Sequence, residues 1–140
     1  MVVLLGCLAA HIVIAGLLPS PWWVPDLTLV GLIVAIGRSS DRWAVCSGLT
    51  GLTTAIWAIR FPQLILAGSL FLGWIVHALA KQWDITDLRL QWLLVAVLSC
   101  VTTFGWLWLE DLWSLRLIGI GFVHVLMTSL SVPLIRRLAC

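Results

Sequence analysis

The sequence predicts an all-α fold, a polytopic transmembrane helical bundle that forms one domain over residues 1–140. The first observation is the composition, because 62% of the residues are hydrophobic and only 10% are charged. A water-soluble domain carries far more charge. The second is that charged residues, prolines and glycines divide the chain into six apolar segments, without an internal repeat. The net charge of +2 comes with no basic patch, so nucleic acid is not expected as a partner.

The six segments are expected at residues 2–18, 24–37, 43–59, 63–80, 90–109 and 112–135. Five are long enough to cross a hydrocarbon core of about 30 Å as helices. The second is too short, because Asp26 is not expected deep in lipid and the run LTLVGLIVAIG reaches only about 16 Å. It is expected to be a half-helix, a tilted span at a thin site, or a helix shielded by protein.

The stretch before this short segment, PSPWWVPD, combines prolines, tryptophans and an aspartate. Pro25 cannot continue a preceding helix, and Asp26 is a favourable N-cap whose carboxylate accepts free amide hydrogens of the first turn. Trp22 and Trp23 prefer the membrane–water interface. We therefore expect the stretch from Pro19 to Asp26 to be a rigid interfacial elbow, either structural or in contact with a partner or ligand.

The distribution of Lys and Arg predicts the topology. If all six segments cross, one face of the membrane carries six cations: Arg38, Arg42, Lys81, Arg89, Arg136 and Arg137. The other face carries Arg60 and Arg116. This bias places both the N-terminus and the C-terminus in the cytoplasm. If the second segment re-enters instead, the N-terminus lies outside.

Small residues in the third and fourth segments predict close helix packing. Ser47, Gly51 and Ala55 recur every four residues, as do Thr50, Thr54 and Ala58, and Gly48 belongs to the same run. Ser69 and Gly73 continue the pattern in the fourth segment. Such stripes let two helices approach closely in a membrane. We expect these two segments to form the tightly packed core.

Three histidines, His11, His77 and His124, are the residues within the spans that could ligate a metal or pigment. Each stands alone in its segment, without an acidic or cysteine neighbour at ligand spacing. A polar residue within a membrane segment is a functional candidate because its burial in lipid is costly. We expect instead that each histidine hydrogen-bonds a backbone carbonyl or a serine, so no metal or cofactor is predicted.

The acidic residues do not suggest catalysis. Asp84 and Asp87 lie in a loop where they are expected to pair with Lys81 and Arg89. No motif of a hydrolase, metalloprotease, redox centre or phosphate-binding loop occurs. An enzyme is therefore not expected.

The chain is tryptophan-rich, with ten tryptophans and no tyrosine. Six fall at expected span ends, where an interfacial belt explains them. Trp57, Trp74, Trp106 and Trp108 lie nearer the span interiors. We expect these four to fill gaps between helices, with contact to lipid or a ligand pocket as the alternatives.

In order along the chain, these features resemble the rod-shape-determining MreD family of the bacterial inner membrane. The resemblance rests on the Pro25-Asp26-Leu27 start of the short segment, the Gly48-Leu49 and Gly51-Leu52 pairs, the basic loop after the fourth segment, the LRLQWLL opening of the fifth and the basic C-terminal edge. It covers nearly the whole chain.

The resemblance implies a non-enzymatic membrane scaffold of the cell-elongation machinery, embedded in membrane lipids. Its implied partners are an MreC-like single-span protein, an actin-like cytoplasmic protein, and a peptidoglycan polymerase and transpeptidase pair. The family is similar in fold to the substrate-binding subunits of energy-coupling-factor vitamin transporters. A vitamin-like solute-binding subunit is therefore the first alternative. An accessory pigment- or haem-binding subunit is the second.

Overall fold

The computed structural model describes residues 1–18, 24–57, 61–110 and 114–139. Within these ranges the chain is helical and contains no strand, so the all-α prediction is confirmed. The elements are α1 (Val2–Leu17), α2 (Leu27–Arg38), η2 (Ser40–Arg42), α3 (Trp43–Trp57), α4 (Pro62–Gln82), α5 (Leu88–Leu109) and α6 (Leu115–Ala139).

Fewer helices are long enough to cross a membrane than the sequence predicts. In the described ranges three are long and apolar enough, namely α4, α5 and the Leu115–Arg137 part of α6. The helices α1 and α2 are apolar but shorter, and the described part of α3 has 15 residues. The expectation of five full-length helices is therefore not met by these ranges.

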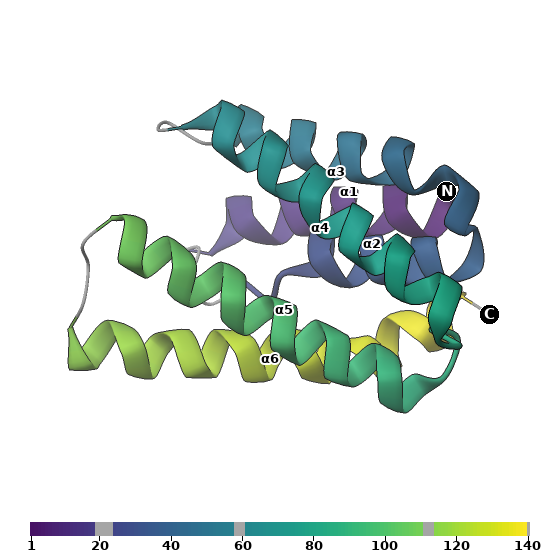
Figure 1. Cartoon of the computed structure of the whole chain (residues 1–140). Helices are drawn as coiled ribbons and strands as arrows, with labels where there is room; N and C mark the ends of the chain where they lie inside the picture. Colours follow the sequence, from purple (N-terminus) through teal and green to yellow (C-terminus); the bar gives the residue numbers. More distant parts are fainter. Residues whose placement is uncertain (19–23, 58–60, 111–113, 140) are drawn as a thin grey trace.

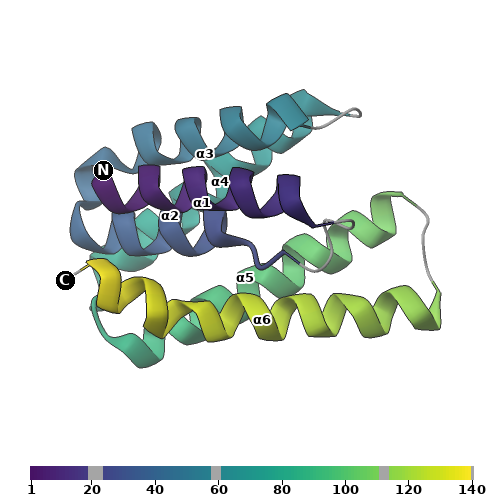
Figure 2. The ribbon, with the colours of Figure 1, turned by 180° about the vertical axis from the view of Figure 1, so that it is seen from behind.

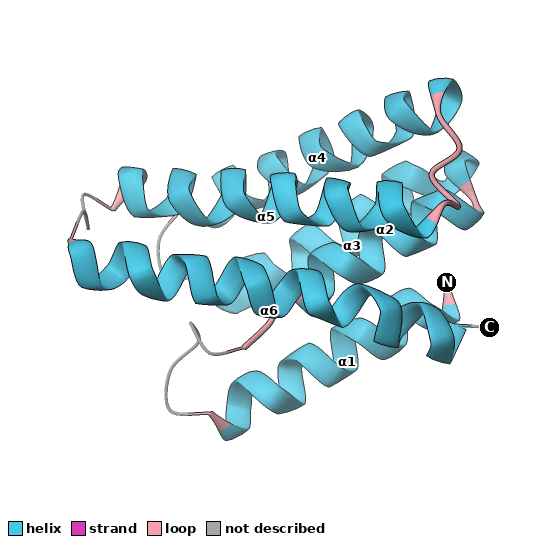
Figure 3. Cartoon of the chain, turned by 90° about the horizontal axis from the view of Figure 1, so that it is seen from below, coloured by secondary structure: helices cyan, strands magenta, loops and turns pink. Residues whose placement is uncertain are grey.

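Successive helices run in opposite directions and form three hairpins, α1 with α2, α3 with α4, and α5 with α6 (Figure 1). The N- and C-termini lie at the same end of the bundle (Figure 1). The six cations counted above lie at this end too. They are Arg38 in the last turn of α2, Arg42 in η2, Lys81 in the last turn of α4, Arg89 in the first turn of α5, and Arg136 with Arg137 in the last turn of α6. We call it the basic end. Figure 3 shows α5 and α6 side by side along their length.

The short helix α2 occupies the centre of the bundle. It packs against α1, α3, α4, α5 and α6, and every residue from Leu27 to Ile36 is buried. Figure 2 shows that α2 extends over only part of the length of α1 and α6. Of the possibilities left open by its length, shielding by protein is observed, and whether α2 also reaches across only half of a bilayer stays a prediction. The hydrophobic core is accordingly built around α2, and not around α3 and α4 as predicted.

The helix starts follow from local sequence. Asp26 is the N-cap of α2, as predicted, and its Oδ1 accepts a hydrogen bond from the Leu29 amide at 3.0 Å. Asp87 caps α5 through the Arg89 amide at 3.1 Å. The Ser114 hydroxyl accepts from the Leu117 amide at 3.2 Å at the start of α6. Pro62 occupies the first turn of α4. Proline is tolerated there because the first amides of a helix have no acceptor within the helix, so no hydrogen bond is lost.

The helices α3 and α4 approach closely through reciprocal small residues. A Cβ atom on Gly51 would collide with the Ser69 hydroxyl, and one on Gly73 would collide with the Ser47 hydroxyl. Gly48 is different, because a Cβ atom on it would have open space, with no atom of a packing neighbour within 4 Å. Ala55 is half-buried. The close contact therefore uses the Ser47–Gly51 face of α3, and Gly48 lies off it.

Candidate functional site

A cavity of about 330 Å³ lies between α4 and α5, above the start of α2. The two helices spread apart with distance from the loop that joins them at the basic end (Figure 1). Most of the lining is apolar and comes from leucine, isoleucine and valine side chains. The polar lining consists of Asp26, Thr28, Thr50, Thr54, Ser69, Thr102 and the indole of Trp106. We call this cavity the α4–α5 groove.

Asp26 is half-buried and lies beside the middle of α6. Its backbone amide donates a hydrogen bond to Thr128 Oγ1 at 2.9 Å, and Thr128 is a fully buried residue about halfway along α6. The neighbouring Val24 is also buried. Pro25 and Asp26 are half-buried, and their expected place in an interfacial elbow stays a prediction. Pro19, Trp22 and Trp23 lie outside the described residues, so their interfacial position stays a prediction.

The Asp26 carboxylate has one occupied and one available oxygen. Oδ1 accepts from the Leu29 amide and from the Thr28 hydroxyl. Among the described residues, no hydrogen bond reaches Oδ2. A carboxylate that lines a cavity with a free oxygen can accept a further hydrogen bond or a positive charge.

The hydroxyl groups of the groove are already committed as donors. Thr50, Thr54, Ser69 and Thr102 each donate to a carbonyl oxygen about one turn earlier in the same helix, at 2.8–2.9 Å. Thr28 donates to Asp26. These side chains therefore present the lone pairs of their hydroxyl oxygens to the groove. Apart from the Trp106 indole N–H, the polar side chains form an acceptor surface, which suits a guest that brings donors.

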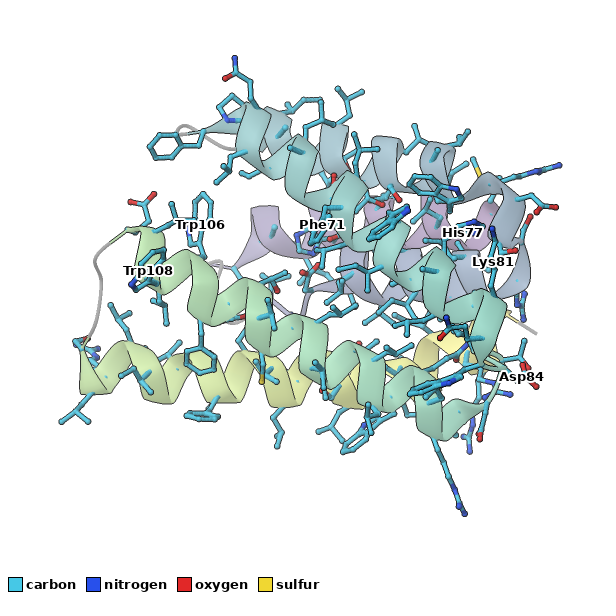
Figure 4. All side chains as sticks on the ribbon, in the orientation of Figure 1. Phe71, His77, Lys81, Asp84, Trp106 and Trp108 are labelled. Atoms are coloured by element: carbon cyan, nitrogen blue, oxygen red, sulfur yellow. The ribbon has the colours of Figure 1, made fainter. Side chains whose placement is uncertain are left out.

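The tryptophans differ in their surroundings. Trp106 lines the groove and rises from α5 towards α4 (Figure 4). Trp74 is 52% exposed and Trp108 is 70% exposed, so the expectation that they fill gaps between helices is wrong. Trp74 stacks on Phe71 at the surface of α4, with ring centroids 6.0 Å apart. The side chain of Trp57 is outside the described part of the structure.

A second cavity, of about 300 Å³, lies on the other side of the start of α2 and is lined by His11. Thr28 and Thr54 line both this cavity and the groove. His11 Nδ1 is buried and has no hydrogen-bond partner within the described part of the chain. The expected bond to a carbonyl or serine is therefore absent at this nitrogen.

The other two histidines belong to different helices. His77 on α4 stacks on Trp43, with ring centroids 5.5 Å apart. Its buried Nδ1 also lacks a hydrogen-bond partner among the described residues. His124 lies on α6, where its carbonyl oxygen accepts from Thr128 Oγ1 at 2.8 Å. Across the described ranges, no three histidine, cysteine or acidic residues come together in a group that could hold a metal ion.

The acids at the basic end have local roles in place of the expected ion pairs. Asp84 accepts hydrogen bonds from the Thr86 hydroxyl and amide, and Asp87 caps α5. Neither forms an ion pair with Lys81 or Arg89 within the ranges that are described. Figure 4 places Lys81 and Asp84 at this end, far along the molecule from Trp106.

The sequence anticipated the groove only in part. Asp26 and the Thr50–Thr54 repeat were visible as polar residues in apolar surroundings. Thr28 and Thr102 carried the same signal, a hydroxyl within an apolar run, but nothing local indicates that they meet. That meeting depends on α2 lying between the two helical hairpins.

Comparisons of the chain with models of known protein families, with curated proteins and with solved structures found no match. The resemblance to the MreD family therefore rests on the sequence features given above. The similarity in fold to vitamin-binding transporter subunits likewise stays a prediction.

Proposed function

We propose that this protein is a non-enzymatic integral membrane scaffold that binds the transmembrane helix of a single-span partner in the α4–α5 groove. The observation that carries the proposal is the position of Asp26, an ionisable residue that lines an open cavity halfway along α6. A charged side chain at the bilayer centre costs about 2.5–3.5 kcal/mol on insertion scales, so such residues face a partner, a cavity or water.

The chemistry of the groove favours a helix that brings hydrogen-bond donors. Its walls are apolar and suit the side chains of a membrane helix. Its floor offers Asp26 Oδ2 and the lone pairs of hydroxyls whose protons are already donated. Interhelical hydrogen bonds to polar side chains hold membrane helices together. A lysine, arginine or hydroxyl at the centre of the partner helix is the matching group.

The membrane arrangement belongs to the same proposal. All six helices cross or line the bilayer, with the basic end in the cytoplasm, following the excess of Lys and Arg on cytoplasmic loops. The helix α2 spans only the cytoplasmic half, and α1, α3, α4, α5 and α6 shield it from lipid. The groove then opens to lipid between α4 and α5, where a neighbouring helix can enter sideways.

The biological role that we propose is in cell elongation and peptidoglycan synthesis at the bacterial inner membrane. It rests on the resemblance to the MreD family. The partners are then an MreC-like single-span protein and the peptidoglycan polymerase and transpeptidase pair. Of the Pro25-Asp26-Leu27 motif in that resemblance, Asp26 caps α2 and lines the groove. We therefore assign this residue a role in partner binding.

The test is mass spectrometry of proteins and small molecules that co-purify from native membranes in mild detergent. We expect a single-span partner with the wild-type chain. Asp26→Asn keeps an N-capping side chain but removes the charge. Hydrogen bonds to charged groups are worth about 1.5–3 kcal/mol, so partner recovery is expected to fall about tenfold or more. Asp84→Asn, which removes an exposed carboxylate at the basic end, is the control and is expected to leave recovery unchanged.

A small-solute site is the second candidate, because about 330 Å³ falls at the lower end of the usual range of about 300–1,000 Å³ for ligand pockets. A stoichiometric vitamin-like solute without a protein partner would support it and contradict helix docking. Recovery of haem or chlorophyll would contradict both and direct attention to the histidines. Full partner recovery with Asp26→Asn would show that the groove is not the docking site.

A further inference from the structure

A separate cleft lies at the basic end, between the start of α5 and the end of α6. It consists of two adjoining cavities of about 420 and 250 Å³, which share Leu88 and Pro133 in their linings. The larger cavity also contacts Arg89, and the smaller one contacts Arg136 and Arg137. Three arginines from two helices therefore surround one continuous cleft, far from the α4–α5 groove.

The shape of α6 helps to form this cleft. Pro133 lies within α6, and a proline there removes one helical hydrogen bond and bends the helix. The last turns of α6 bend away from the line of the helix in Figure 2. Space remains beside the first turns of α5, where Leu88, Trp92 and Leu93 have exposed side chains. The cleft is thus apolar along one side and basic at its rim.

Arg136 provides the strongest indication of a ligand. Its Nη1 is buried and has no hydrogen-bond partner among the residues that the structure describes. A guanidinium is always charged and carries only donors, so a buried unpaired N–H of this kind calls for an acceptor. A phosphate offers several acceptor oxygens and the opposite charge, and arginine pairs with it in a two-pronged geometry.

We propose that this cleft binds an anionic glycerophospholipid. The arginines Arg89, Arg136 and Arg137 hold the phosphate, and an acyl chain lies along Leu88, Leu93 and Pro133. Trp92 is suited to the headgroup level, where tryptophan is favoured. Basic pockets between membrane helices on the cytoplasmic side are suited to anionic headgroups. The occupant is a lipid and not a free phosphate, because the larger cavity is almost wholly apolar.

The experiment is native mass spectrometry of the full chain in detergent, titrated with phosphatidylglycerol or with phosphatidylcholine of the same acyl chains. We expect at least tenfold tighter binding of phosphatidylglycerol. The double variant Arg136→Gln/Arg137→Gln is expected to lose that preference. The control Arg42→Gln/Lys81→Gln removes two charges from the same end but away from the cleft, and is expected to keep it within about twofold.

Two further measurements keep the outcome clear. Size-exclusion profile and thermal unfolding show whether the double variant folds. If it does not, the single variant Arg89→Gln replaces it, because Arg89 is exposed and its substitution is not expected to disturb folding. This variant is expected to weaken the binding of phosphatidylglycerol. Inorganic phosphate at millimolar concentration is expected not to displace the lipid. Equal loss in the control would show general attraction to a charged surface and overturn the proposal. Displacement by phosphate, or equal binding of phosphatidylcholine, would overturn it too.

Discussion

At the scale of the residue, Asp26 combines two roles that act on different parts of its carboxylate. Oδ1 closes the first turn of α2 by accepting from Leu29 and Thr28, while the other oxygen remains for the groove. The backbone amide of the same residue ties the start of α2 to Thr128 of α6. A single residue therefore fixes where the central helix begins and places an acceptor beside the middle of α6.

Asp84 offers a prediction for pH. Hydrogen bonds from the Thr86 hydroxyl, and then from the Thr86 amide, lower the pKa of this carboxyl below its ordinary value. Thr86→Val removes the hydroxyl and is expected to raise the pKa part of the way back, whereas Thr86→Ser retains the low value. The measurement is an NMR titration of the Asp84 carboxyl carbon.

The sign of the pH effect follows from linkage. Because the folded pKa lies below the unfolded one, the stabilisation is present above the unfolded pKa and disappears as the pH falls through the folded pKa. Asp84 is fully exposed, so this local effect is small. An unchanged pKa in Thr86→Val would contradict the assignment to the hydroxyl.

The residue-scale predictions from the sequence succeeded where the cause is local. The Pro25-Asp26 pair predicted a helix cap because capping depends on the next three residues. The position of Asp26 beside α6 was not predicted, because it depends on where α6 packs, more than 100 positions along the chain. Asp87 is a different case, because two local interactions were possible there: its carboxylate caps α5 through the Arg89 amide and does not form the expected ion pair with the Arg89 side chain.

At the scale of the element, α2 is unusual in being buried on every side. Its hydrophobic run has no polar face, a pattern typical of a helix in a large core or a membrane. The sequence showed that the run LTLVGLIVAIG is too short to cross a bilayer, and the helix that it forms has 12 residues. It did not show what covers the helix, because five separate helices provide the cover.

The contact between α3 and α4 makes a second prediction. Gly51→Ala is expected to destabilise the protein by about 1–3 kcal/mol, the usual cost of overpacking, because the new Cβ would collide with Ser69. Gly48→Ala is the matched control on the same helix. It has open space and is expected to be neutral or to stabilise by up to about 1 kcal/mol through helix propensity.

Thermal unfolding in detergent measures both variants. Ser69→Gly in the Gly51→Ala background is expected to recover part of the loss, since it removes the colliding hydroxyl. Equal effects of the two alanines would mean that the contact face is wrongly assigned. The small-residue stripe predicted that α3 and α4 meet, but it did not separate Gly48 from Gly51, because the direction of each side chain depends on the helix rotation.

At the scale of the whole molecule, the alternation of six helices brings both termini to the basic end (Figure 1). Epitope tags at the two termini are therefore expected on the same side of the membrane, in the cytoplasm. Both tags should resist protease in right-side-out vesicles and be cleaved in inverted ones. Tags on opposite sides would mean that α2 re-enters and that α1 lies on the other side of the bilayer.

The central claim is that a partner helix occupies the α4–α5 groove, and photocrosslinking in native membranes tests it most directly. Val101 lines the groove and is 61% exposed, while Phe122 on α6 does not line it and is 59% exposed. A benzoylphenylalanine at position 101 is expected to crosslink to one defined polypeptide, and Asp26→Asn is expected to abolish that crosslink. The same probe at position 122 is expected to crosslink to lipid. Lipid alone at position 101, or the same polypeptide from both positions, would contradict the claim.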